Sequence, residues 1–138
     1  SRWSDTTPSL NLTHIFEGEI NRKGKPTGFH YENPKPSAAS ARIKEILSKP
    51  NKYGIYTAIV EIYDPETNQW KSKFSSLFPK TLGKASVIKA IVDVVRQSAT
   101  VKAGRWRGLS AYGFQIEGYR LKDGRVVTAY PIYEAAPK

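Results

Sequence analysis

The dipeptide Asp123-Gly124 stands between two strand-like segments, residues 113–122 and 125–133. Asp-Gly in this setting is the strongest short-range signal for a β-hairpin, because glycine readily adopts the positive φ angle that a tight turn requires. A two-residue turn would place Tyr119 opposite Thr128. The C-terminal part of the chain is therefore predicted to be a pair of antiparallel strands.

The rest of the chain mixes strand and helix patterns. Residues 54–63 and 69–78 are rich in β-branched and aromatic residues and flank a turn signal, so they are expected to pair as strands. Residues 84–98 are predicted to form a helix with a buried apolar stripe. The stripe consists of Val87, Ile88, Ile91, Val94 and Val95.

A second helix is expected over residues 37–48. Its apolar residues recur at helical spacing, and Ser37 is a suitable N-cap. The apolar positions are Ala39, Ile43, Ile46 and Leu47.

The N-terminal third has weaker patterns. Residues 14–20 fit a short strand or a helical turn, and the Gly- and Lys-containing residues 21–28 fit a loop. Residues 1–13 are interpreted as an N-terminal tail or peripheral segment, and residues 14–138 as a single domain. The predicted fold class is α+β.

Charge and composition limit the classes of function. The chain has 22 Lys and Arg residues against 12 Asp and Glu, a net charge of +10. This balance favours a polyanionic partner: nucleic acid, an anionic membrane surface or an acidic protein. The absence of cysteine excludes disulfides, thiolate zinc sites and cysteine nucleophiles. Neither a transmembrane helix nor a signal peptide is expected. Because it contains no methionine, the chain is expected to be a fragment or a processed form of something longer.

The chain contains two histidines, His14 and His30. Histidine changes protonation near neutral pH, so two of them can supply a base and an acid to one reaction. Cleavage of RNA by its own 2′-hydroxyl is such a reaction, and a nearby cation would offset charge on the phosphoryl oxygens. No paired carboxylates or metal-ligand spacing accompany them, so neither a metal ion nor a cofactor is expected. The residue types alone also fit ordinary surface or core histidines.

Basic and aromatic residues fit the same chemistry. Arg22, Lys23 and Lys25 lie between the two histidines, in a segment suited to follow a phosphate backbone. Thr128 and Tyr130 share one face of a predicted strand, where Tyr130 offers a ring for stacking a base.

Lys71, Lys73 and Ser75 alternate along another predicted strand and also share a face. Either lysine is a candidate cation for the phosphoryl group, and the same pattern fits an ordinary solvated strand face.

These pieces occur in an order that resembles the EndoU family of endoribonucleases, in particular the bacterial type found as C-terminal toxin domains of contact-dependent growth inhibition proteins. The similarity covers residues 14–133. Its motifs are His14 to Asn21, Gly28-Phe29-His30, Ser75 to Pro79, Lys122 to Arg125 and Thr128 to Pro131.

The resemblance implies a role for each matching residue. His30 corresponds to the general base and His14 to the general acid, while Thr128 and Tyr130 hold the uridine or ribose. Lys71 is the preferred catalytic lysine because Ser75 lies four residues further on, and Lys73 is the alternative. The implied fold has two small antiparallel sheet regions with flanking helices.

The implied function is a metal-independent endoribonuclease toxin. It would cleave RNA, with tRNA near uridine as the expected target, and leave a 2′,3′-cyclic phosphate and a 5′-hydroxyl. The expected partners are this RNA and an acidic immunity protein. The domain would be exported as the end of a larger effector and act in the cytoplasm of target bacteria. The alternatives are a basic RNA- or DNA-binding module without catalytic activity and a membrane-acting basic toxin.

Overall fold

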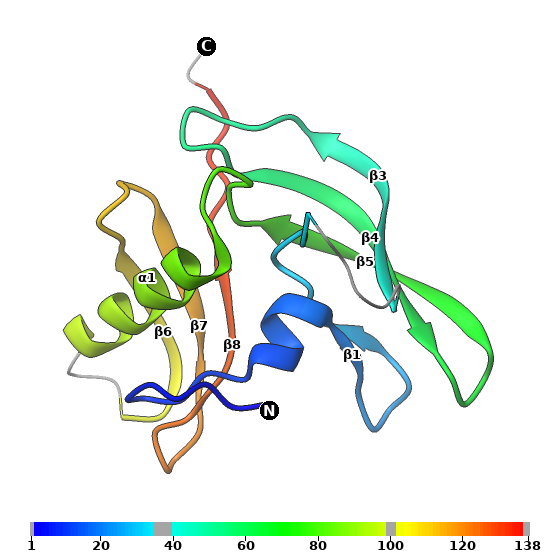
Figure 1. Ribbon diagram of the computed structural model, residues 1–138, viewed down its shortest axis with the longest axis horizontal. Helices are drawn as coiled ribbons and strands as arrows, with labels where there is room; N and C mark the ends of the chain where they lie inside the picture. The colour runs from blue at the N-terminus through cyan, green and yellow to red at the C-terminus, as the bar shows by residue number, and fades with distance from the viewer. Residues whose placement is uncertain (1, 35–39, 99–101, 137–138) are drawn as a thin grey trace.

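A computed structural model describes residues 2–34, 40–98 and 102–136. Within these residues the chain forms two three-stranded antiparallel sheets, a helix and a short two-stranded ribbon (Figure 1). The expected α+β class is confirmed. The first sheet has the order β3 (Ala41–Ser48), β4 (Tyr56–Asp64) and β5 (Gln69–Leu77). The second has the order β6 (Gly104–Leu109), β7 (Gln115–Arg120) and β8 (Val126–Pro131).

The helix α1 (Lys84–Gln97) covers one face of the second sheet (Figure 1). The predicted stripe forms the contact: Val87, Ile91, Val94 and Val95 are buried, and Ile88 is partly buried. Opposite them, Trp106 of β6 is 1% exposed. The prediction of this helix is therefore confirmed.

Residues 14–30 connect the two sheets. They comprise a one-turn π-helix, η1 (Thr13–Glu17), followed by the ribbon strands β1 (Glu19–Ile20) and β2 (Pro26–Thr27). The segment thus contains both a helical turn and a strand. Ile15 and Phe16 are buried in the core beneath α1, whereas Phe29 is buried in the separate core of the first sheet. Residues 14–30 are therefore fixed at both ends by hydrophobic packing.

The C-terminal hairpin is present, and Tyr119 pairs with Thr128 as predicted. The turn differs from the expected two-residue type. Leu121 N–H donates to the Arg125 carbonyl over 2.8 Å, and Gly124 has a φ of +95°. The loop therefore has three residues, with the glycine in a positive-φ conformation that favours glycine. A register shift between Tyr119 and Arg120 restores the predicted pairing.

The predicted helix over residues 37–48 is wrong, because residues 41–48 form the edge strand β3. A register shift between Ile43 and Glu45 places Ile43 opposite Val60 and Ile46 opposite Ala58. Two apolar residues on the same side of a strand thus stand three apart in sequence, which imitates helical spacing. Ser37 and Ala39 lie outside the described residues.

The last part of the expected N-terminal segment, residues 1–13, packs against the second sheet. Leu10 is 0% exposed and belongs to the core beneath α1. Asn11 N–H donates to the Val126 carbonyl, and Val126 N–H donates to the Ser9 carbonyl. This segment therefore lies along β8, the strand that carries Thr128 and Tyr130. Strand β6 was not predicted from the sequence.

Gly118 on β7 provides a test of the core of the second sheet. A Cβ atom at this position would lie 2.2 Å from the Thr128 carbonyl oxygen and 2.4 Å from the Trp106 ring. Because both neighbours are part of the packed sheet, we expect Gly118→Ala to lower the free energy of unfolding by about 1–3 kcal/mol. Urea unfolding followed by tryptophan fluorescence measures this change.

Gly83 is the matched control, since a Cβ atom there has no neighbour within 4 Å and its φ is −70°. Gly83→Ala should leave the free energy of unfolding within about 0.5 kcal/mol of the unmutated value. Equal unfolding midpoints for the two variants would contradict the close packing assigned to Gly118.

Candidate active site

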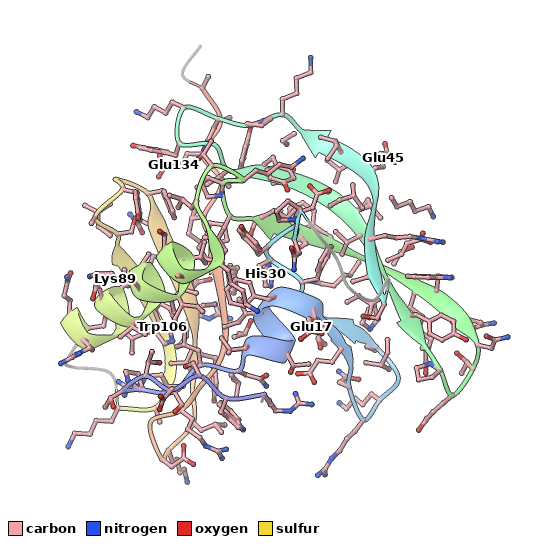
Figure 2. All side chains as sticks on the ribbon, in the orientation of Figure 1. Glu17, His30, Glu45, Lys89, Trp106 and Glu134 are labelled. Carbon is pink, nitrogen blue, oxygen red and sulfur yellow. The ribbon has the colours of Figure 1, made fainter. Side chains whose placement is uncertain are left out.

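A cleft with a volume of about 720 Å³ lies between the edge strand β5 of the first sheet and β8 of the second. It brings together six of the residues singled out in the sequence: His14, His30, Lys73, Ser75, Thr128 and Tyr130. They come from η1, β5, β8 and the segment that follows β2. His30 lies near the centre of the molecule, between the two sheets (Figure 2).

The backbone brings the two histidines together. Phe29 N–H donates to the His14 carbonyl over 2.9 Å, and His30 N–H donates to the Ile15 carbonyl over 2.7 Å. Gly28 and Phe29 both have positive φ angles, +79° and +63°. A Cβ atom on Gly28 would lie 2.0 Å from the His14 carbonyl oxygen. Only glycine therefore permits this close approach.

Strand β5 holds the same segment from the other side. The predicted shared face of its alternate residues is present, and each of these side chains donates a 2.7 Å hydrogen bond to a backbone carbonyl. The pairs are Lys71 Nζ with Gly24, Lys73 Nζ with Gly28, and Ser75 Oγ with Phe29. This row of bonds fixes the segment that ends at His30.

The side chain of His30 is buried and held in one orientation. Its Nδ1 lies 2.9 Å from the Ser76 carbonyl oxygen, which can only accept a hydrogen bond, so Nδ1 carries the proton. The other ring nitrogen, Nε2, is then an unprotonated acceptor. Burial, together with the neighbouring Lys73 ammonium, lowers the pKa of His30 to about 3. This histidine is therefore neutral at physiological pH.

His14 has a different environment. Its Nδ1 lies 3.2 Å from Oε2 of Glu19, which also forms an ion pair with Arg2. Burial lowers the pKa of His14 below its ordinary value, and the Glu19 carboxylate opposes this by favouring the imidazolium. The site therefore pairs a neutral histidine with one whose protonated form has a carboxylate partner.

Glu19 was not identified as a site residue from the sequence, although it stands five positions after His14. Gly18, with a φ of +77°, reverses the chain between η1 and β1. This reversal places the carboxylate beside the imidazole. An acidic residue closely following the histidine was the available signal.

The two candidate lysines have different positions. Lys73 lines the cleft, and burial lowers the pKa of its ammonium group to about 8, so it remains largely protonated at neutral pH. Lys71 lies outside the cleft, where its Nζ forms a 2.7 Å ion pair with the buried carboxylate of Asp64. The geometry therefore favours Lys73 as the cation near the histidines. The family resemblance had favoured Lys71 instead.

Thr128 and Tyr130 form the β8 wall of the cleft, as their shared strand face predicted. The centre of the Tyr130 ring lies 5.4 Å from that of His30. Its hydroxyl donates a hydrogen bond to the carboxylate of Glu117, which is itself paired with Arg107. Burial and the neighbouring carboxylate raise the pKa of Tyr130 to about 12, so its hydroxyl stays protonated. Glu117 was not identified from the sequence.

The remaining predicted RNA-binding residues do not line the cleft, and Arg22 lines a separate hollow with Asp64 and Glu66. Arg22, Lys23 and Lys25 are exposed on the turn between β1 and β2. The following Pro26 and Thr27 line the cleft, so the basic turn continues from its rim.

The described residues lack the features of two further classes of function. Across the described ranges, no group of three or more His, Asp or Glu side chains is placed to hold a metal ion together. Within the same residues, the helices are too short or too polar to span a bilayer.

Comparison with known proteins gives two findings. The model of the family described as bacterial EndoU nuclease matches residues 9–133. A protein of Bacillus cereus named "Toxin" is 31% identical over 123 residues, which is 87% of this chain and 22% of that protein. The chain thus spans about a fifth of the length of this relative. No solved structure matches. The family match includes both histidines and both sheets, and the chain belongs to the bacterial EndoU nuclease family.

Proposed function

We propose that this nuclease domain is a metal-independent endoribonuclease toxin that cleaves RNA by attack of a 2′-hydroxyl on the adjacent phosphate. The observation that carries the proposal is the difference between the two histidines of the cleft. His30 is neutral with a free Nε2, and His14 is paired with Glu19. One is suited to accept a proton and the other to donate one.

The proposed reaction uses these groups in turn. His30 Nε2 takes the proton of the 2′-hydroxyl, and the 2′-oxygen attacks phosphorus. The bond from phosphorus to the 5′-oxygen breaks, and His14 Nε2 donates a proton to that leaving oxygen. The products are a 2′,3′-cyclic phosphate and a 5′-hydroxyl. His30 then loses its proton to water and His14 regains one.

Lys73 and Glu19 support this reaction electrostatically. The Lys73 ammonium lies in the cleft, where it would offset negative charge on the phosphoryl oxygens. The Glu19 carboxylate accepts a hydrogen bond from the Nδ1–H of His14, so the proton donated in the reaction is the one on Nε2. Glu19 is thus a positioning residue that also stabilises the protonated acid.

Thr128 and Tyr130 are proposed to hold the nucleoside that supplies the 2′-hydroxyl. Their wall of the cleft faces His30, the proposed base, and the Tyr130 ring offers a surface on which a base can stack. The resemblance to EndoU toxins of contact-dependent growth inhibition supports uridine as this nucleoside and tRNA as the target.

The toxin assignment also has proposed partners. The name of the Bacillus cereus relative, "Toxin", supports a toxin. The resemblance to C-terminal toxin domains supports the proposal that this domain is exported as the end of a larger effector and acts inside target bacteria. The net charge of +10 and the exposed Arg22, Lys23 and Lys25 suit both an RNA backbone and an acidic immunity protein. Opposite charges accelerate the association of such a pair.

Removal of each histidine tests the proposed proton transfers. His14→Ala and His30→Ala should each lower the rate of RNA cleavage at least about 100-fold, because each removes a proton-transfer group. Both variants should retain RNA binding in a fluorescence anisotropy assay. An oligonucleotide with 2′-deoxyribose at the cleavage position should be inert, while the matched all-ribose oligonucleotide is cut.

Sequencing of the product ends would then identify the nucleotide and the cyclic phosphate. Retained cleavage of the deoxy substrate would refute the mechanism. Absence of cleavage by the unmutated protein, with RNA binding intact, would favour a non-catalytic RNA-binding module.

The second prediction distinguishes the two lysines of β5. Lys73→Met should lower the cleavage rate about 10²–10³-fold, since it removes a positive charge next to the proposed phosphate position. Lys71→Met is the matched control, because it removes the same charge two residues away and outside the cleft. It should reduce thermal stability by leaving the buried Asp64 carboxylate unpaired, yet the folded protein should remain active. The opposite order of the two activities would assign the role to Lys71.

The third prediction concerns pH. Activity requires neutral His30, whose pKa is about 3, and protonated His14, whose pKa lies below 6.5. The profile of kcat/KM should therefore be bell-shaped with a maximum on the acidic side of neutrality, the two histidines titrating as a coupled pair.

Glu19→Gln removes the carboxylate that favours the imidazolium, which lowers the pKa of His14. The alkaline limb should then move to lower pH, while Glu66→Gln, on the turn between β4 and β5, should leave it in place. An unchanged alkaline limb in Glu19→Gln would contradict the role given to Glu19.

A further inference from the structure

Part of the cleft on the first sheet is not used by the proposed reaction. Phe74 of β5 lines the cleft although 58% of its surface is exposed to solvent. It follows Lys73 directly, so the two side chains point to opposite faces of the strand. Because β5 is an edge strand, the cleft can extend around its edge from Lys73 to Phe74. An exposed phenylalanine in a catalytic cleft is a ready surface for an apolar or aromatic ligand group.

A row of hydroxyl groups lies next to Phe74. The register of the first sheet aligns Ser48 of β3 with Thr57 of β4, and Thr57 with Ser76 of β5. All three residues line the cleft. Within the described part of the chain, none of the three side-chain hydroxyls makes a hydrogen bond, although Thr57 and Ser76 are buried to 4% and 9% exposure. Among the described residues, these hydroxyl oxygens are not among the fully buried atoms that lack a partner, so they open onto the cleft. Their position there leaves them available to donate to or accept from a ligand.

We propose that Phe74 together with Ser48, Thr57 and Ser76 forms a subsite for the nucleoside that follows the scissile phosphate. The inference rests on the proposed function, which gives the preceding nucleoside to Thr128 and Tyr130. The phosphate then lies at His14, His30 and Lys73, and the chain of the substrate continues onto the β5 wall. The base stacks on the Phe74 ring, and the hydroxyls bond its polar edge or its ribose.

The chemistry of this wall fits a nucleoside well. A base has a flat face that stacks on an aromatic ring, and polar atoms at its edge that both donate and accept hydrogen bonds. Hydroxyl groups can also donate and accept, so they match any of the four bases without a change of charge. The subsite therefore adds binding energy for the leaving nucleoside while permitting several bases.

The test measures binding of two ligands that resist the proposed cleavage. The first is the dinucleotide 2′-deoxyuridylyl-(3′→5′)-2′-deoxyadenosine, and the second is the methyl ester of 2′-deoxyuridine 3′-phosphate. They have the same charge. The dinucleotide carries a second nucleoside on the phosphate, where the other ligand carries a methyl group. For the unmutated protein, affinities from NMR titration should favour the dinucleotide. Phe74→Ala should weaken dinucleotide binding about 5- to 150-fold and leave binding of the methyl ester unchanged.

Further variants separate stacking from general effects on the fold. Phe74→Trp should retain dinucleotide affinity, whereas Phe74→Leu should lose most of it, because an apolar side chain without a ring cannot stack. Thr57→Val keeps the shape of the side chain and should weaken the dinucleotide about 2- to 10-fold. Leu109→Ala is the control, since Leu109 is 60% exposed and lies on β6. It should change neither affinity.

The results distinguish this subsite from the proposed function. Equal affinities of the unmutated protein for the two ligands, or equal weakening of both by Phe74→Ala, would overturn the subsite even if RNA is cleaved. Selective loss of the dinucleotide supports the subsite. If that loss occurs in a protein that cleaves no RNA, the proposed reaction fails while the nucleoside subsite stands.

Discussion

Lys73 and Ser75, on one face of β5, donate hydrogen bonds to the backbone carbonyls of Gly28 and Phe29, and the placement of both histidines depends on these two bonds. Residues 21–28 have little regular structure of their own, so their conformation must be imposed from outside. The β5 donors hold this segment on one side, and the backbone of η1 holds it on the other. Phe29 and Ile15 anchor the segment in two separate hydrophobic cores. The geometry of the cleft therefore results from the relative position of the two sheets, and each sheet contributes one wall.

The two histidines differ because their surroundings differ. Each is largely removed from water, which disfavours the charged form of both. For His30 the neighbouring Lys73 adds to this effect, and the carbonyl of Ser76 fixes the tautomer. For His14 the carboxylate of Glu19 acts in the opposite direction. The Lys73 cation near His30 and the Glu19 carboxylate near His14 thus suit two histidines to opposite proton transfers.

Much of this arrangement could be predicted from local sequence patterns. The hairpin around Asp123-Gly124, the helix after Gly83 and the shared strand faces of β5 and β8 follow from spacing alone, because period and turn chemistry are local properties. Strand β3 was misassigned because a register shift gives its apolar residues the spacing of a helix. The choice between Lys71 and Lys73, and the roles of Glu19 and Glu117, depend on contacts between segments distant in sequence or on a chain reversal. Such contacts have no periodic signal, so only the folded structure reveals them.

The alternation of side chains along β5 has a consequence for how this domain can diversify. Lys71, Lys73 and Ser75 face the loop that carries His30, whereas Phe74 and Ser76 face the outer part of the cleft. Substitutions at the second set would alter which RNA is accepted without moving the reacting groups. One strand thus carries the groups of the proposed chemistry on one side and those of the proposed subsite on the other. Under this proposal, the preference for the following nucleoside can change one residue at a time while the reacting groups stay in place.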